Sequence, residues 1–321
     1  YTVNKEGRGP AFYGTLFEDQ AENGLGMALA VKQRRGAVRL QAEKLLPMVT
    51  GTELESAINA WIASFDDLDA NDADARALVS ALEAAELTGE ARGLADDILL
   101  HRDQLSKKVV WLFGGDGWAY DIGYGGLDHV IASGENVNIL VFDTEVYSNT
   151  GGQASKATPV GSVAQFAAAG KATKKKDLAG IAMSYGYVYV AQVAMGADYN
   201  QCIKAFTEAE SYNGPSIIIA YAPCINHGIK GGMGISQAEE KKAVAAGYWN
   251  NFRFDPRKAD NGENPFTLDS KAPTASYRDF IMGEVRYNSL TRAFPERAEK
   301  LFEKAEKAAA AKAAETAGAA Q

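Results

Sequence analysis

The stretch VVWLFGGDGWAYDIGYGGLDHVIASGENVNILVFDTEVYSNTGGQ (109–153) decides the fold. It contains two short apolar runs, VVWLFG (109–114) and VNILVFD (137–143), and a segment of helical spacing over 121–132 between them. Uninterrupted apolar runs of this length are typical of strands that are buried on both faces of a parallel sheet. We therefore predict a βαβ unit here, with a right-handed crossover through the helix.

The same alternation continues toward the C-terminus. The apolar runs YVYVAQV (187–193) and PSIIIAYAP (215–223) predict two more strands, with a helix over 198–212 between them. Further elements are predicted as helices over 160–169, 177–185 and 236–246, and as an edge strand within 248–254. Strands and helices that alternate at this spacing indicate a three-layer α/β/α fold with a mostly parallel sheet.

Helical spacing also dominates residues 52–106, which we predict to be a helical insertion. Thr52 is placed to cap one helix, and Asn71 or Asp72 to cap the next. Between these helices, FDDLDANDADA (65–75) holds five aspartates and no basic residue. This is typical of a solvated turn with helix N-terminal charges, and a site for a cation or a basic partner stays open as the alternative.

The composition changes after Asp255-Pro256, where the chain becomes polar and rich in turns. Helices over 274–283 and 295–314 would make residues 256–321 a mostly helical C-terminal extension. Residues 1–255 would then form one domain around the sheet, interrupted by the helical insertion at about 52–106.

The composition excludes several classes of protein. The chain has 321 residues, of which 46% are hydrophobic and 23% charged, as in globular proteins. Its net charge of −8 argues against nucleic-acid partners, and no apolar run is long enough to predict a membrane partner or a membrane span. Two cysteines suit a reducing cytoplasm. The chain begins at Tyr1 without Met or a signal peptide, so we expect a piece of a longer polypeptide.

Chemistry-bearing residues follow the first two predicted strands. Asp116 lies among Gly114, Gly115 and Gly117 directly after the first strand, and Thr144 follows the second, 28 positions later. Because parallel strands end at one edge of a sheet, a carboxylate, a hydroxyl and a backbone carbonyl can meet there. Such oxygens suit Mg²⁺, which usually takes further ligands from phosphates. A GDG turn alone is weak evidence for a binding site, since an aspartate in such a turn is commonly only a helix cap.

Four segments together resemble the pyruvate:ferredoxin (flavodoxin) oxidoreductases, which are thiamin-diphosphate enzymes. They are NKEGRGPAFYGTLFEDQAENGLGMALA (4–30), LFGGDGWAYDIGYGGLDHVIASGENVN (112–138), DTEVYSNTGGQASKATP (143–159) and YAPCINHGIKGGMG (221–234). The resemblance covers most of the chain. It implies the C-terminal thiamin-diphosphate-binding domain of a larger enzyme, with the thiamin-diphosphate-binding fold.

The resemblance assigns roles by motif position. It implies Mg²⁺ ligands at the Asp116 carboxylate, the Thr144 hydroxyl and the Val146 carbonyl. The cofactor-binding residues that it implies are Gly115, Asp116, Gly117, Trp118, Thr144, Glu145, Val146, Tyr147, Ser148 and Asn149. Asn149 is implied to be catalytic, near the reacting thiazolium, although a turn former before a glycine pair would also explain an asparagine there.

Cys224 opens a glycine-rich loop after the fourth strand. Taken alone, it is best interpreted as a small buried hydrophobe. The resemblance implies instead that Cys224 is one ligand of a [4Fe–4S] cluster, which needs four thiolates. The resemblance also implies that the other three come from upstream of this chain. Cys202 lies on a predicted helix, matches no ligand position and is interpreted as a packing residue. His227, in the same loop, either tunes the cluster or satisfies the loop's hydrogen bonds.

Two other polar groups have plainer interpretations. The run Lys174-Lys175-Lys176 is typical of a solvated face. Asn136 and Asn138 favour a turn before the second strand, with a structural Ca²⁺ site as the weaker alternative.

The resemblance implies the oxidative decarboxylation of pyruvate with coenzyme A, giving acetyl-CoA and CO₂, with electrons leaving through [4Fe–4S] clusters to ferredoxin or flavodoxin. The partners would be these molecules and the remaining domains of a cytoplasmic, homodimeric enzyme. The glutamate that activates the cofactor would belong to another domain, so the isolated chain should be inactive. A non-oxidative thiamin-diphosphate decarboxylase or synthase, and a non-catalytic subunit that retains the fold, stay open as alternatives.

Overall fold

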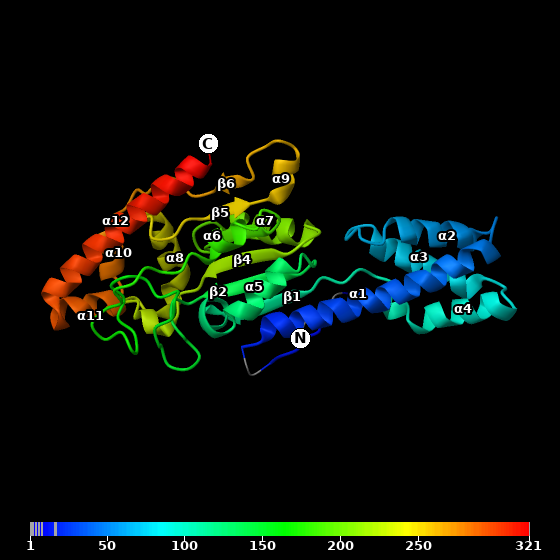
Figure 1. Ribbon diagram of the computed structural model, residues 1–321, viewed down its shortest axis with the longest axis horizontal. Coiled ribbons are helices and arrows are strands. Elements are labelled where there is room, and N and C mark those ends of the chain that lie inside the picture. Colours follow the sequence, from blue (N-terminus) through cyan, green and yellow to red (C-terminus); the bar gives the residue numbers. More distant parts are fainter. Residues whose placement is uncertain (1–2, 4, 6, 8, 16–17, 321) are drawn as a thin grey trace. The chain divides into compact units, whose positions relative to one another are not determined.

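The computed structural model describes residues 3, 5, 7, 9–15 and 18–320 (Figure 1). Five residues of the 4–30 segment quoted above (4, 6, 8, 16 and 17) lie outside these, as does Tyr1. The chain divides into two compact units. One unit is formed by Tyr1–Gly24 together with Trp111–Gln321, and the other by Leu25–Val110.

A six-stranded sheet forms the centre of the first unit, with the strand order β1-β2-β4-β3-β5-β6. The strands are β1 (Trp111–Gly115), β2 (Asn138–Asp143), β3 (Tyr189–Val193), β4 (Ser216–Tyr221), β5 (Phe252–Phe254) and β6 (Phe266–Leu268). Strands β1 to β4 pair with one another in parallel, whereas β5 pairs antiparallel with both β3 and β6. The prediction of a mostly parallel sheet is therefore confirmed.

Both faces of this sheet are covered. In β4, the consecutive residues Ile217, Ile218 and Ile219 are each at most 1% exposed. Because successive strand residues point to opposite faces, burial of all three requires packing on both sides. The helices of this unit include α5 (Tyr124–Ala132), α6 (Leu178–Met183), α7 (Tyr199–Ser211) and α8 (Ser236–Ala245), which agree with the predicted crossovers. The three-layer α/β/α class is confirmed.

Two predictions about secondary structure are wrong. Residues 160–169 form turns and isolated bridges instead of a helix, and Gly161 and Phe166 both have positive φ angles, of 84° and 65°. A helix excludes such backbone angles. In addition, β5 is not an edge strand, because β6 pairs with it on its outer side. The three-residue β6 lies in a polar, turn-rich segment that masked its strand character.

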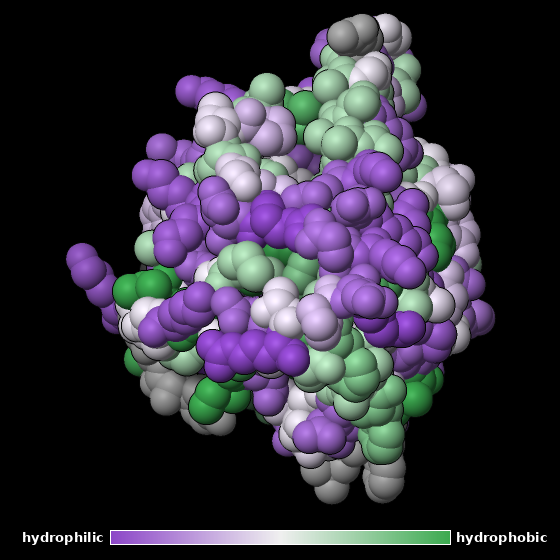
Figure 2. Space-filling view, turned by 90° about the vertical axis from the view of Figure 1, so that its left-hand side faces the viewer, coloured by the Kyte–Doolittle hydropathy of each residue, from purple (hydrophilic) through white to green (hydrophobic). Residues whose placement is uncertain are grey.

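The C-terminal part of the first unit is mostly helical. Its helices are α9 (Pro256–Asp260), α10 (Tyr277–Met282), α11 (Val285–Ala293) and α12 (Pro295–Ala319), of which the sequence predicted α10 and α12 but not α9 or α11. Figure 1 shows α10, α11 and α12 near one another, and residues of each pair are in contact. The molecular face on the α11 side, seen in Figure 2, is largely hydrophilic, with small apolar areas between the hydrophilic residues.

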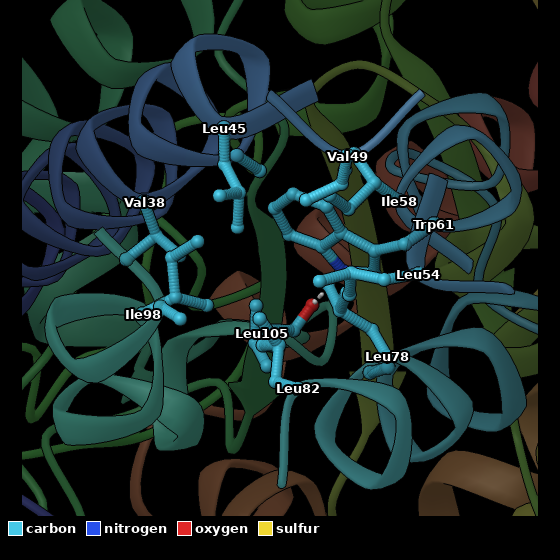
Figure 3. Packing of buried hydrophobic residues seen from close by; sticks show 13 residues of the cluster. Val38, Leu45, Val49, Leu54, Ile58, Trp61, Leu78, Leu82, Ile98 and Leu105 are labelled. Carbon is cyan, nitrogen blue, oxygen red and sulfur yellow. Dashed lines mark hydrogen bonds between the residues drawn. The ribbon is translucent and has the colours of Figure 1, made fainter. Parts of the chain in front are cut away.

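The second unit is a helical bundle with its own core. It contains most of α1 (Gln20–Leu45), together with α2 (Glu53–Ala63), α3 (Asn71–Ala84) and α4 (Gly89–Leu100). Its core consists of thirteen buried side chains (Figure 3): Val38, Ala42, Leu45, Val49, Leu54, Ile58, Trp61, Ala75, Leu78, Leu82, Ala95, Ile98 and Leu105. The Trp61 indole N–H donates to the Leu105 carbonyl oxygen at 3.0 Å, so this buried polar group is satisfied.

The helix caps in this unit test the sequence prediction directly. Thr52 caps α2 as predicted, since its hydroxyl accepts from the Glu55 N–H at 3.3 Å. The prediction for α3 is wrong: its N-cap is Ala70, and Asn71 is fully buried. The Asn71 side chain instead accepts from the backbone N–H of Lys107. Asn71 could have capped the helix, but in the folded chain it is buried and binds a backbone group that is remote in sequence.

The acidic segment 65–75 closes the turn before α3. Asp67 Oδ1 accepts from the backbone N–H groups of Asp69 and Ala70, each at 2.8 Å.

Across the described residues, no group of three or more His, Cys, Asp or Glu side chains could hold a metal. The same part of the chain has no helix that is long and apolar enough to cross a membrane.

Candidate functional site

The site starts at the turn after β1, which packs too tightly for side chains at two of its glycines. A Cβ at Gly114 would lie 2.0 Å from the Trp118 ring, and a Cβ at Gly117 would lie 2.3 Å from the Tyr147 ring. These contacts place Asp116 at the end of the strand, where it is 1% exposed. The chain then enters a π-helix over Gly117–Ile122 before α5, so the helical segment starts earlier than the sequence indicated.

The end of β2 brings the second group of residues to the same place. Strands β1 and β2 are in register, with Gly115 opposite Phe142. The Thr144 hydroxyl oxygen lies 3.0 Å from Asp116 Oδ1 and 3.0 Å from the Val146 carbonyl oxygen. The three oxygens that the family resemblance implied as Mg²⁺ ligands therefore lie close together. One hydroxyl proton can serve only one of the two acceptors at a time, which leaves acceptor capacity that a cation can use.

Among the described residues, the side chains that donate hydrogen bonds to Asp116 are neutral hydroxyls. Its second oxygen accepts from the Ser155 hydroxyl, which the sequence analysis did not single out. Burial raises the pKa of Asp116 to about 7, and the nearby charge of Asp143 adds to this, while the hydrogen bonds from Ser155 and Thr144 oppose it. A carboxylate, a hydroxyl and a carbonyl are ligands that suit Mg²⁺, so the residues present fit this ion.

The turn after Thr144 is closed by backbone hydrogen bonds. The Tyr147 N–H donates to the Gln153 carbonyl at 2.9 Å, and the Gly152 N–H donates to the Tyr147 carbonyl at 2.8 Å. Ser148 and Asn149 are exposed at the tip of this turn. The remaining predicted cofactor residues are placed as follows: Gly115 is half-buried, and Trp118 is fully buried with its ring packed on Gly114.

Glu145 has an unusual conformation in this turn. Its φ is 59°, in the left-handed region, which is rare for a residue other than glycine. Its side chain is buried and meets two cations: Lys175 Nζ at 3.0 Å and an Arg286 guanidinium nitrogen at 2.7 Å. Burial alone would raise the pKa of Glu145, but the charges of Lys175 and Arg286 outweigh it and hold the pKa well below its usual range.

The lysine run is a correction to the sequence analysis. Lys174 is exposed, as expected for a solvated face. Lys175, however, is paired with the fully buried Asp143 at 2.7 Å as well as with Glu145. Lys176 lies over the ring of Tyr124, 2.9 Å from its centroid. The interpretation as a solvated face is therefore wrong for Lys175 and Lys176, because their acidic and aromatic partners are remote in sequence.

The Cys224 loop follows β4 and lies against the Thr144 turn. A Cβ at Gly152 would lie 2.8 Å from Asn226 Oδ1. Cys224 is half-buried, and its sulfur accepts from the Asn226 N–H at 3.3 Å. His227 is fully buried, and its Nδ1 accepts from the Cys224 N–H at 2.9 Å. Burial lowers the pKa of His227 to about 4, and the charge of Arg286 contributes, so the ring is neutral at pH 7.

Three minor interpretations can also be compared with the structure. Cys202 is 8% exposed on α7 and packs in the cluster beneath that helix, as expected for a packing residue. The Asn136 amide donates to Asn213 Oδ1 at 2.8 Å, and Asn138 is the buried first residue of β2. His227 makes the hydrogen bond that satisfies its loop, one of the two roles considered for it.

A basic cavity of about 670 Å³ adjoins Ser155. Its charged lining consists of Asp121, Lys156, Lys171, Lys174, Lys176 and Arg297. Burial lowers the pKa of Lys171 to about 8, and the charge of Lys175 contributes. Five cationic side chains against one carboxylate make this cavity suitable for an anionic ligand.

Comparisons with known proteins identify a family and relatives of this chain. The family model "Thiamine pyrophosphate enzyme, C-terminal TPP binding domain" matches residues 93–220. The chain is 58% identical to a pyruvate:ferredoxin oxidoreductase of Moorella thermoacetica over 95% of its length, which is 26% of that protein. It is 52% identical to a pyruvate-flavodoxin oxidoreductase of Klebsiella pneumoniae, over 98% of this chain and 27% of that one. It thus spans about a quarter of these relatives.

A solved structure of a 2-oxoglutarate:ferredoxin oxidoreductase from Magnetococcus marinus is also similar, with a TM-score of 0.37 at 19% identity. The match covers 58% of this chain and 68% of that one.

Proposed function

The chain is homologous, over nearly all of its length, to a segment of the pyruvate:ferredoxin and pyruvate-flavodoxin oxidoreductases, and we propose that it is the part of such an enzyme that binds thiamin diphosphate and Mg²⁺. One observation carries this proposal. The Thr144 hydroxyl lies 3.0 Å from both the Asp116 carboxylate and the Val146 carbonyl, at the carboxyl ends of two parallel strands. Ligands of open α/β sheets bind at this edge.

We assign the following metal-binding, diphosphate-binding and catalytic roles to residues of this chain. Asp116, Thr144 and Val146 would hold Mg²⁺, and the backbone of the two turns would line the diphosphate. Thiamin diphosphate, when bound, supplies a thiazolium that acts as the electron sink for decarboxylation. Asn149 would serve as the catalytic polar residue, because its exposed position at the tip of the turn leaves it available to a substrate.

Cys224 would supply one thiolate of a [4Fe–4S] cluster. Its half-buried position at the start of the loop keeps the sulfur partly accessible, whereas Cys202 is enclosed in the packing under α7. Such a cluster needs four thiolates, so the other three would come from other parts of the enzyme.

The substrates and partners of the whole enzyme are part of the proposal. They are pyruvate and coenzyme A, ferredoxin or flavodoxin as the electron acceptor, the remaining domains of the same polypeptide, and a second copy of the cytoplasmic enzyme. The basic cavity beside Ser155 is compatible with the anionic charge of pyruvate, coenzyme A and the cofactor.

Calorimetric titration of thiamin diphosphate into the metal-depleted full-length enzyme, with and without Mg²⁺, tests the cofactor site. We expect Mg²⁺-dependent binding that is weakened about 100-fold or more in Asp116→Asn, since the only carboxylate of the ligand set is lost. Asp128→Asn is the control, because this carboxylate lies in α5, accepts from the Tyr185 hydroxyl at 2.8 Å and does not line the basic cavity. Equal binding by Asp116→Asn and the wild type would contradict the proposal.

Iron and sulfide analysis tests the cluster. We expect Cys224→Ser to lower the iron and acid-labile sulfide content, because one thiolate ligand is lost. Cys202→Ser should leave both unchanged. Full iron content in Cys224→Ser would remove Cys224 from the ligand set. The absence of iron and sulfide from the wild-type enzyme would favour a non-oxidative thiamin-diphosphate enzyme.

A further inference from the structure

One side chain, Glu145, lies between the turn that carries the proposed Mg²⁺ ligands and the loop that carries Cys224. We propose that Glu145 is a positioning residue, whose carboxylate holds this turn and this loop in one rigid frame. The inference rests on the proposed function, because it concerns the relative position of the diphosphate site and the cluster ligand. It adds a role for a buried side chain whose carboxylate pairs with Lys175 and Arg286.

The backbone of Glu145 is fixed at every polar group. Its N–H donates to Asp143 Oδ1 at 3.2 Å, and its carbonyl accepts from the Thr158 hydroxyl. Its positive φ turns the chain between Thr144 and Val146, the two neighbours that would hold the metal. A left-handed conformation persists at a non-glycine residue only where the surroundings over-determine it.

The contacts of the Glu145 carboxylate hold the residue in this conformation. One oxygen is 3.0 Å from Lys175 Nζ. The other accepts from the Tyr248 hydroxyl at 2.6 Å and pairs with Arg286 at 2.7 Å. These partners precede α6, follow α8 and lie in α11, so three separate parts of the chain converge on one buried carboxylate. Charge-assisted bonds of this kind are both strong and directional.

The same carboxylate also faces the Cys224 loop. Its second oxygen is 3.6 Å from His227 Nε2. Because His227 Nδ1 accepts the Cys224 N–H, the proton of the neutral ring is assigned to Nε2, on the side of Glu145. A parallel link runs through α11, where the Val285 N–H donates to the Gly228 carbonyl at 2.9 Å and the next residue binds Glu145.

This arrangement has a consequence for electron transfer. The thiazolium would be anchored through the diphosphate at Thr144, and the cluster through Cys224. The separation of the two groups then depends on how rigidly the turn and the loop are joined. Residues that orient ligands in this indirect way typically change metal affinity or activity ~10- to 100-fold when they are replaced.

Glu145→Gln in the full-length enzyme tests the frame with two readouts that do not depend on turnover. We expect the Kd of thiamin diphosphate in the presence of Mg²⁺ to rise ~10- to 100-fold. We also expect the electron paramagnetic resonance spectrum of the reduced cluster to change. Thr144→Val should weaken cofactor binding without altering that spectrum, so a change in both readouts is the specific signature of Glu145.

Asp269→Asn is the matched control for stability, because Asp269 pairs with the largely buried Arg253 at 2.8 Å, away from both loops. It should destabilise the fold and leave both readouts unchanged. A Glu145→Gln enzyme in which only one readout moves, or neither, overturns the proposal while the proposed function stands. If the wild-type enzyme itself fails to bind thiamin diphosphate, the proposed function fails, and this inference fails with it.

His227→Gln covers the case in which Glu145→Gln does not fold, since it leaves the ion pairs of Glu145 intact. We expect a changed cluster spectrum and a smaller rise in the Kd of thiamin diphosphate. An unchanged cluster spectrum in His227→Gln would overturn the link between the carboxylate and the Cys224 loop.

Discussion

Replacement of Lys175 by methionine removes the cation shared by two buried carboxylates. Lys175 Nζ lies 2.7 Å from Asp143 and 3.0 Å from Glu145, and these carboxylates are 0% and 1% exposed. Methionine retains most of the apolar stem, so the change isolates the charge. Glu145 would keep Arg286, but within the described part of the chain Asp143 would keep only the Tyr120 hydroxyl, at 2.7 Å, as a side-chain donor.

The loss of folding stability should be large, because the Lys175→Met variant leaves a buried carboxylate without its cation. Removal of one partner of a buried ion pair typically destabilises a protein by about 3–5 kcal/mol. In a unit of this size, each 1 kcal/mol lowers the melting temperature by ~2–4 °C, which gives a decrease of roughly 6–20 °C. Asp143→Asn in the Lys175→Met background should recover part of this loss, since it removes the unpaired charge.

Differential scanning calorimetry of the 321-residue chain measures this effect. Because the sheet unit and the helical unit can melt separately, the change is read from the transition of the sheet unit, which contains Lys175. Lys174→Met is the matched control: Lys174 is exposed beside Lys175, and its replacement should change stability by no more than about 0.5 kcal/mol. Equal melting temperatures for Lys175→Met and Lys174→Met would refute the reasoning. So would simple additivity of the Lys175→Met and Asp143→Asn effects.

Two further predictions concern the same unit. Gly114→Ala should lower the free energy of unfolding, measured with denaturant, by about 1–3 kcal/mol, because its Cβ would overlap the Trp118 ring. Gly115→Ala is the control and should have a small effect, because the space around its Cβ is open. Equal losses of stability in the two variants would argue against this packing. Burial raises the pKa of Glu284 to about 7 against an ordinary 4.5, although Arg286 opposes the shift. The folded pKa exceeds the unfolded one, so this contribution to stability is present below the ordinary pKa and is lost as the pH rises through about 7. Glu284→Gln should flatten that decline in a pH series of unfolding experiments, and an unchanged slope would count against the assignment.

The sequence was most informative where structure depends on neighbours along the chain. Continuous apolar runs identified the four parallel strands, and the glycines around Asp116 indicated a close-packed turn. Parallel strands end at one edge of a sheet, so the approach of Asp116 and Thr144 followed from topology alone. The capping of α2 by Thr52 was also predictable, because a cap acts within a few residues.

Contacts between distant segments decided the rest. Lys175 reads as one member of a basic run, yet Asp143 and Glu145, some thirty positions earlier, draw it into the interior. Ser155 binds Asp116 across 39 positions, and β6 became a strand only by pairing with β5. Hydrophobic periodicity reports which residues face a core, but it carries no information about which charges meet there. The apolar pattern by itself therefore determined the sheet, while only the folded chain decided which buried carboxylate meets which cation.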